Sequence, residues 1–216
     1  MIKLTKYVHS CLLAEAGNIS VLFDPGTYSW NSGIFNTDKH NHLNAVVITH
    51  EHPDHFSEEF VKFLHETFPD LTFIAPPKVT QRLKAMGIKN ASPDSNESIE
   101  VFSNKPHADT RPLLDTLPPE NIAVHFADKL TVGGDRHDLE ESKAVLAFPI
   151  TAPWGSVKEG AEMVMHLKPK YAFPLHDWHW SPTAREAEYE RSGNMYSNNG
   201  INFLKPHDGE TIEIEV

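Results

Sequence analysis

Short apolar runs separated by turn residues divide the chain into many strands and fewer helices. The run at residues 45–48 is apolar throughout, which is typical of a strand buried on both faces. Ala16-Gly17-Asn18 is a turn signal between two alternating segments. The pattern predicts strands at residues 2–8, 11–15, 19–23, 45–48, 71–75, 99–102, 122–127, 130–132, 144–148, 171–175, 201–204 and 211–216.

Helices are expected where apolar residues recur every three or four positions between capping signals. Residues 57–68 are the clearest case, because Ser57 can cap the first turn and Pro69 stops the last. Further helices are predicted at residues 78–86, from the capping box Ser156-Val157-Lys158-Glu159 to about residue 167, and from Ser181-Pro182 to Gly193. Strands come first and helices are interleaved later, which favours an α/β or α+β fold with mixed sheets and outer helices.

A chain of 216 residues without a linker-like tract predicts one domain over residues 1–216. Within it, residues 92–115 are rich in Ser, Asn, Asp and Pro and are expected to lie outside the core. No stretch is apolar for long enough to span a bilayer, and the first residues lack a signal-peptide core. Cys11 is the only cysteine, which excludes an intramolecular disulfide and fits a cytoplasmic protein.

Charge narrows the choice of partner. Nineteen Lys and Arg residues against thirty Asp and Glu residues give a net charge of −11, and a field of that sign repels polyanions. We therefore expect a small-molecule substrate and neither nucleic acid nor a membrane as partner.

Histidine is the residue type that points to chemistry. The segment His50-Glu51-His52-Pro53-Asp54-His55 places four candidate metal ligands, His50, His52, Asp54 and His55, within six residues, directly after the apolar run at 45–48 and Thr49. In an extended loop, His50 and His52 project to the same side and can share one ion. A solvated histidine-rich turn is the alternative, but this spacing at the end of a strand favours a metal site, in which Zn²⁺ accepts imidazole and carboxylate together.

The segment from Thr49 to His55 resembles the signature of the metallo-β-lactamase superfamily, threonine-His-x-His-x-Asp-His. The opening Lys6-Tyr7-Val8-His9-Ser10-Cys11-Leu12-Leu13 and Leu22-Phe23-Asp24-Pro25 are similar to the branch that contains ascorbate-6-phosphate lactonase, although Val8 stands where that branch usually has glycine. The resemblance implies a four-layer αβ/βα sandwich with the site at one edge, between two sheets. Self-association is common among relatives, so a homo-oligomer stays open.

The resemblance also implies a ligand set for two divalent ions. It places His50, His52 and His107 on one ion, Asp54, His55 and His176 on the other, and Asp135 between them. Asp135 and His176 each follow an apolar strand, as the histidine-rich segment does, so several strand ends can meet at one sheet edge. His107 is favoured over its rival His125, which lies inside a predicted strand. Zn²⁺ suits this set best, with Mn²⁺ or Fe²⁺ as alternatives.

The predicted function is a metal-dependent hydrolase in which a metal-activated water attacks a small polar lactone, ester or phosphoester. Asp54 would orient the nucleophile, and His179 would donate a proton or contact the substrate. Alternatives of the same fold are a nuclease, an iron-dependent oxidoreductase similar to persulfide dioxygenase, and a non-catalytic descendant.

Several nearby residues have two interpretations each. Asp24 either braces the metal loop or only ends a strand, and His9 either lines the site or is a core histidine. Trp178 and Trp180 either form an apolar wall or pack in the core. Arg111 and Arg136 either meet an anionic substrate or carry surface charge.

Overall fold

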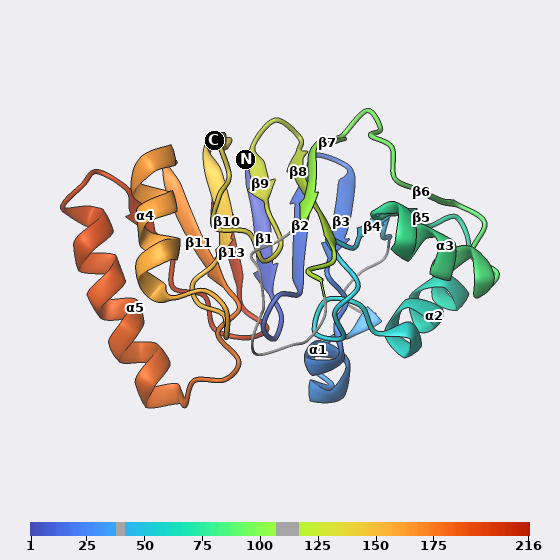
Figure 1. The fold of residues 1–216 in the computed structure, drawn as a ribbon, viewed down its shortest axis with the longest axis horizontal. Coiled ribbons are helices and arrows are strands. Elements are labelled where there is room, and N and C mark those ends of the chain that lie inside the picture. Colours follow the sequence, from blue (N-terminus) through green and yellow to red (C-terminus); the bar gives the residue numbers. More distant parts are fainter. Residues whose placement is uncertain (38–41, 107–116) are drawn as a thin grey trace.

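Two β-sheets lie face to face, and helices cover the outer face of each. The computed structural model describes residues 1–37, 42–106 and 117–216. The first sheet has the strand order β13-β1-β2-β3-β4-β5-β6, and the second has the order β12-β11-β10-β9-β8-β7. Helices α4 and α5 flank one side of the paired sheets, and α2 and α3 flank the other (Figure 1). The four-layer αβ/βα sandwich expected from the sequence is confirmed.

The elements follow one another along the chain as β1 (Ile2–Lys6), β2 (Leu12–Ala16), β3 (Ile19–Phe23), α1 (Thr27–Ser32), β4 (Ala45–Val47), α2 (Glu58–Thr67), β5 (Thr72–Ile74), α3 (Pro77–Ala85), β6 (Ala91–Ser92), β7 (Ile99–Pro106), β8 (Glu120–Phe126), β9 (Leu130–Val132), β10 (Val145–Pro149), α4 (Val157–Leu167), β11 (Tyr171–Leu175), α5 (Pro182–Ser197), β12 (Asn202–Phe203) and β13 (Thr211–Ile214). None of the helices in the described parts of the chain has the length and apolar character needed to cross a bilayer.

Three hydrophobic clusters hold the layers together. The largest lies between the sheets and takes alternate residues of both, such as Val47 from β4 and Val124 from β8. Their neighbours point outward, because successive side chains of a strand face opposite sides. Val46 therefore packs in the cluster beneath α2 and α3, and Ala123 in the cluster beneath α4 and α5.

Most predicted elements are present, with local corrections. Helix α5 does not end at Gly193 but continues to Ser197, and Gly193 is buried within it, facing Lys205 and Phe203. Helix α1 and the short β6 were not predicted. The strand predicted at residues 99–102 is present as β7 but continues to Pro106, within the segment expected outside the core. It pairs with β8 along its full length around an irregularity between Val101 and Ser103.

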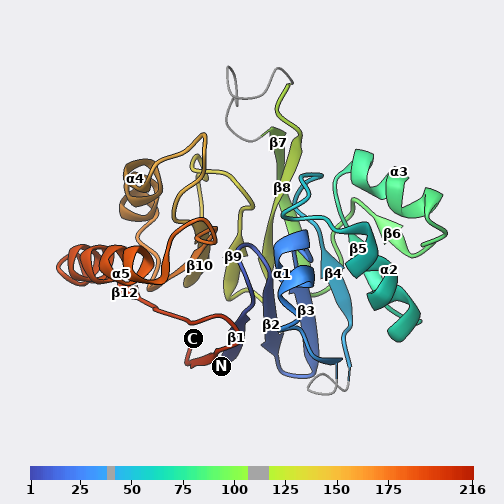
Figure 2. The same ribbon diagram turned by 90° about the horizontal axis from the view of Figure 1, so that it is seen from below.

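The topology brings several strand ends to one edge. Strands β3 to β6 run parallel in the first sheet, and β9 to β12 run parallel in the second. The segments that follow β3, β4, β9 and β11 all carry residues of the site described below. Seen from below, α1 lies near the middle of the molecule, between the helices of the two sides (Figure 2).

Candidate metal centre

Two groups of metal-ligand side chains lie next to each other at this edge. Within each group, the ligand atoms all lie within 4.8 Å of one another. The first group consists of His50, His52 and Asp135, and the second of His9, Asp54, His55 and His176. The residues come from both sheets, so the centre forms only when the sandwich is closed.

Asp135 lies between the two groups. Its Oδ2 is 3.6 Å from Nε2 of His50, in the first group. Its Oδ1 is 3.0 Å from Nε2 of His55 and 3.3 Å from Nε2 of His176, in the second. One carboxylate thus faces both groups, which is the arrangement expected of a residue shared by two ions.

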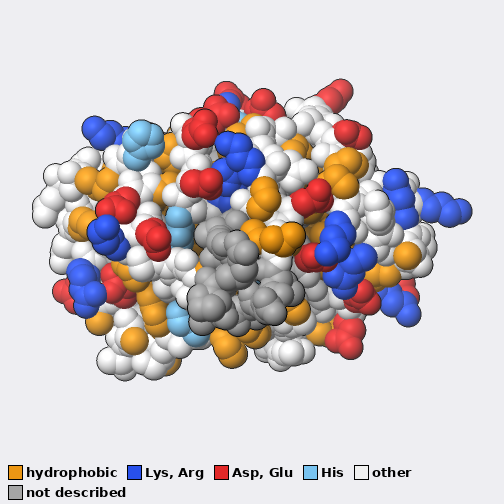
Figure 3. Space-filling model, in the orientation of Figure 1, with side chains coloured by type: hydrophobic (Ala, Val, Ile, Leu, Met, Phe, Trp, Pro, Cys, Tyr) orange, Lys and Arg blue, Asp and Glu red, His pale blue; other side chains and the backbone are white. Residues whose placement is uncertain are grey.

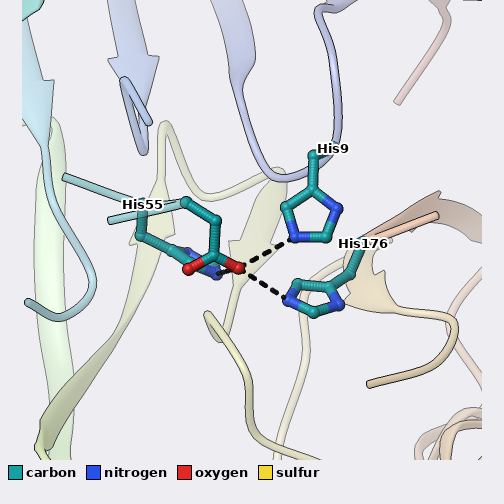
Figure 4. Close-up of side chains that lie close together, drawn as sticks. His9, His55 and His176 are labelled. Carbon is teal, nitrogen blue, oxygen red and sulfur yellow. Dashed lines mark hydrogen bonds and ion pairs between the residues drawn. The ribbon is translucent and has the colours of Figure 1, made fainter. Parts of the chain in front are cut away.

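Asp54 is the centre of the second group. Its Oδ2 lies 3.0 Å from Nε2 of His9, 3.4 Å from Nε2 of His176 and 3.8 Å from Nε2 of His55. Figure 4 shows the rings of these three histidines converging from separate segments. His9 was only a doubtful candidate in the sequence and was absent from the predicted ligand set.

Asp24 braces the histidine-rich loop, which was the first of the two interpretations of this residue. Its side chain accepts hydrogen bonds from the backbone N–H of Thr49 at 2.7 Å and from the Thr49 hydroxyl at 2.9 Å. It also lies 2.8 Å from Nδ1 of His55. A proton held on Nδ1 by this contact leaves Nε2 of His55 free to serve as a ligand, which is the usual role of such an outer carboxylate.

Two hydrogen bonds hold His176, and an ion pair fixes the residue that follows it. Its Nδ1 donates to the carbonyl of Thr151 at 2.7 Å, and its backbone N–H donates to the carbonyl of His9 at 3.1 Å. The next residue, Asp177, is buried and accepts two hydrogen bonds from the buried ammonium of Lys6. Burial alone would raise the pKa of Asp177, but Lys6 and Tyr189 hold it below its usual value.

The donor set fits divalent cations. Among the described residues, Nε2 of His55, Nε2 of His176 and both oxygens of Asp135 are buried, and none forms a hydrogen bond of good geometry, although Oδ1 lies 3.0 Å and 3.3 Å from the two nitrogens. Such atoms are costly to bury unless something else occupies the space between them. Against the effect of burial, the neighbouring carboxylates raise the pKa of His55 and the neighbouring histidines lower that of Asp135. The centre thus favours positive charge between its carboxylates.

Six of the seven predicted ligands come together here. The seventh, His107, lies outside the described residues. Its rival His125 is not in the centre: its Nδ1 lies 3.0 Å from the Thr131 hydroxyl, and its ring stacks on Phe102 at 4.0 Å. His125 is therefore a structural histidine of β8, as its place within a strand indicated.

The other residues considered in the sequence lie in different environments. His179 and Trp178 line the pocket above the second group, whereas Trp180 packs against the cluster beneath α4 and α5. Arg136 does not carry surface charge but is buried, with its guanidinium bound to Asp138 and Ser103. Arg111 lies outside the described residues.

Comparison with known proteins shows the family. The sequence model of a family described as "Beta-lactamase superfamily domain" matches residues 3–105. Protein Rv0786c of Mycobacterium tuberculosis is 31% identical over a match of 210 positions, and the match covers 89% of this chain and 92% of that protein. The chain belongs to the metallo-β-lactamase superfamily, and its His and Asp donors imply divalent metal ions.

Solved structures share the fold. Igni18, a metallo hydrolase from Ignicoccus hospitalis, has a TM-score of 0.71 at 17% identity, and the match covers 99% of each chain. CmlA, a diiron β-hydroxylase from Streptomyces venezuelae, has a TM-score of 0.69 at 14% identity; the match covers 99% of this chain but 54% of CmlA. At these identities the likeness concerns the fold alone.

Proposed function

We propose that this protein is a hydrolase that uses two divalent ions to cleave an ester, lactone or phosphoester bond of a small molecule. The observation that supports this most directly is Asp135, a buried carboxylate that faces both donor groups at once. When bound, a pair of divalent ions supplies a water of lowered pKa and stabilises negative charge on the attacked oxygen. Zn²⁺ matches the donor set best, and Mn²⁺ or Fe²⁺ are the alternatives to test.

The chain's own residues would share the work as follows. His50 and His52 would hold one ion, and Asp54, His55 and His176 the other, with Asp135 touching both. His107, which the family resemblance assigns to the first ion, would complete the set.

Asp54 would also orient the attacking water. Although burial alone would raise its pKa, His55, His176 and His9 lower it, so the carboxylate stays ionised at neutral pH. Burial and the neighbouring His176 lower the pKa of His9 to about 4, so its ring is neutral and can donate from Nε2 to Asp54. His179, whose pKa is lowered by burial and by His176, would contact the substrate from the pocket wall.

A small molecule fits the surface better than nucleic acid does. Lys and Arg side chains are interspersed with Asp and Glu on the face drawn in Figure 3, and the net charge of −11 opposes polyanions. The oxidoreductase alternative has no observation in its favour beyond the fold shared with CmlA.

The test is substitution of the shared carboxylate. Asp135→Ala should lower both metal content and hydrolysis of a panel of esters, lactones and phosphoesters. The loss should exceed the roughly 10–100-fold that removal of an outer-shell partner costs. Asp70→Ala, an exposed aspartate on the loop after α2, is the matched control and should match wild type. An Asp135→Ala protein that kept two ions and full hydrolysis would refute the proposed site.

A further inference from the structure

The pocket above the metal centre has aromatic walls. Its volume is about 320 Å³, near the lower end of the roughly 300–1,000 Å³ typical of ligand pockets. Histidines and Asp54 of the centre line it, together with Tyr28, Pro53, Pro153, Trp154 and Trp178. These residues come from α1, the histidine-rich loop, the segment before α4 and the segment after β11. Four separate parts of the chain thus contribute flat or apolar surface to one hollow.

Trp178 is the most telling of these residues. Its ring is parallel to that of Tyr28, with centroids 4.0 Å apart and planes tilted by 8°. Despite this stacking, 52% of Trp178 is exposed. Few other large hydrophobic residues are exposed in the described parts of the chain. Together with Tyr28, Pro153 and Trp154, Trp178 gives the pocket a shared apolar lining, and an apolar groove of this kind is typical of a ligand-binding site.

The described part of the pocket wall contains no Lys or Arg side chain. Arg136, the cationic neighbour of Asp135, is turned to Asp138 and Ser103 instead. Recognition of a phosphate or carboxylate on the distal part of a substrate ordinarily uses such cations. The walls therefore favour an uncharged group next to the bond that is cleaved.

We propose that the substrate is a carbonyl ester or lactone carrying a flat, uncharged aromatic ring, which lies against Trp178 in this pocket. The proposal rests on the hydrolase function proposed above and narrows it. In the reaction, the oxygen of water forms a bond to the acyl carbon and the ester C–O bond breaks. One proton of the water passes to the leaving alkoxide, giving an alcohol, and the acid loses the other to solvent.

The experiment compares benzyl acetate with ethyl acetate, using metal-loaded protein whose metal content is measured. The acyl group is the same and the leaving alcohols are of similar acidity, so the ratio of the two kcat/KM values reports the ring. We expect a ratio of about tenfold or more in favour of benzyl acetate, arising in KM, because stacking adds to the burial of the ring. Trp178→Ala should reduce the ratio to near one, and Trp178→Phe should restore most of it.

A second measurement separates this proposal from the hydrolase function. Ligand-observed NMR with benzyl alcohol, which cannot be hydrolysed, should show binding to wild type and to Trp178→Phe, and a loss of about tenfold in affinity in Trp178→Ala. If benzyl alcohol binds in this way but no ester, lactone or phosphoester of the panel is cleaved, the hydrolase function fails and the ring site stands. The aromatic-substrate proposal would be wrong if the ratio of the two kcat/KM values were the same in wild type and Trp178→Ala, or if methyl phosphate were the preferred substrate. Either result would leave the hydrolase function intact.

Discussion

Lys6 supports the metal centre from behind, and Lys6→Met should destabilise the protein strongly. The Lys6 side chain is 0% exposed, as is that of Asp177. Its ammonium donates to both oxygens of Asp177 at 2.9 and 3.0 Å and to Oδ1 of Asp208 at 2.8 Å. Methionine has a similar length but no charge and no donor. The substitution would leave Asp177 with the Tyr189 hydroxyl at 2.6 Å and with Arg185 at 3.6 Å.

The size of the effect follows from the buried charge that remains. Removing one partner of a buried ion pair costs about 3–5 kcal/mol, because the other charge keeps its desolvation penalty without compensation. For a chain of this length, each kcal/mol corresponds to roughly 2–4 °C in Tm, which gives a fall of about 6–20 °C. Lys6→Met should also weaken metal binding, since Asp177 directly follows His176.

The assay is urea denaturation followed by circular dichroism, in the presence of a chelator so that metal binding does not contribute. Lys3→Met is the matched control on the same strand: Lys3 is 42% exposed and pairs with Glu213, and exposed pairs contribute little to stability. The double variant Lys6→Met/Asp177→Asn should recover part of the loss, because it removes the uncompensated charge. If Lys6→Met were no less stable than Lys3→Met, the buried network would not stabilise this edge of the fold.

Two further predictions concern the loop that carries the ligands. Asp24→Asn should lower metal affinity by about 10–100-fold in a competition titration. The reason is that the amide cannot accept every hydrogen bond that Thr49 and His55 direct at the carboxylate. An unchanged affinity would contradict the bracing role of Asp24. Gly26→Ala should lower both metal content and Tm, because a Cβ there would overlap the backbone carbonyl of Asp54. Gly193→Ala is the control, because the atom nearest to the added Cβ is the far end of the flexible Lys205 side chain and alanine favours a helix. If Gly26→Ala were as stable as Gly193→Ala, the close approach of Gly26 to Asp54 would not constrain the loop.

The hydrophobic pattern predicted the layers because the spacing of apolar residues depends directly on whether an element is buried on one face or on both. The apolar run at residues 45–48 and the capping box at Ser156 both correspond to observed elements. Short elements left weaker traces: α1 has no side-chain cap, and β6 is only two residues long. Gly193 misled because a glycine inside a helix looks the same in sequence as one that ends a helix.

Within the site, the ligand types clustered in sequence were predictable and the contacts between segments were not. The resemblance to the family indicated Asp135 and His176, but no pattern near His9 distinguishes a ligand-group residue from a core histidine. Its approach to Asp54 depends on the turn between β1 and β2 meeting the histidine-rich loop across the sheet edge. Likewise, the stacking of Tyr28 on Trp178 joins segments that only the closed sandwich brings together.

Backbone conformation gives an independent reason to locate the function at this edge. His9, Asp24 and His176 have φ values of 66°, 47° and 65°, in the left-handed region. A non-glycine residue there costs about 1–2 kcal/mol. Glycine would relieve that cost at each position but would remove a side chain that contacts Asp54, Thr49 or Asp135. Hydrogen bonds across the edge maintain the conformation: the N–H of Asp24 donates to Val47, and that of His176 donates to His9. The other non-glycine residues with positive φ in the described parts of the chain are Ala127 and Asp128, in the turn between β8 and β9, and Lys168, at the end of α4. Strain of this kind persists only where the surroundings enforce it, so its presence at three positions around one buried group of ligands supports a function at this edge.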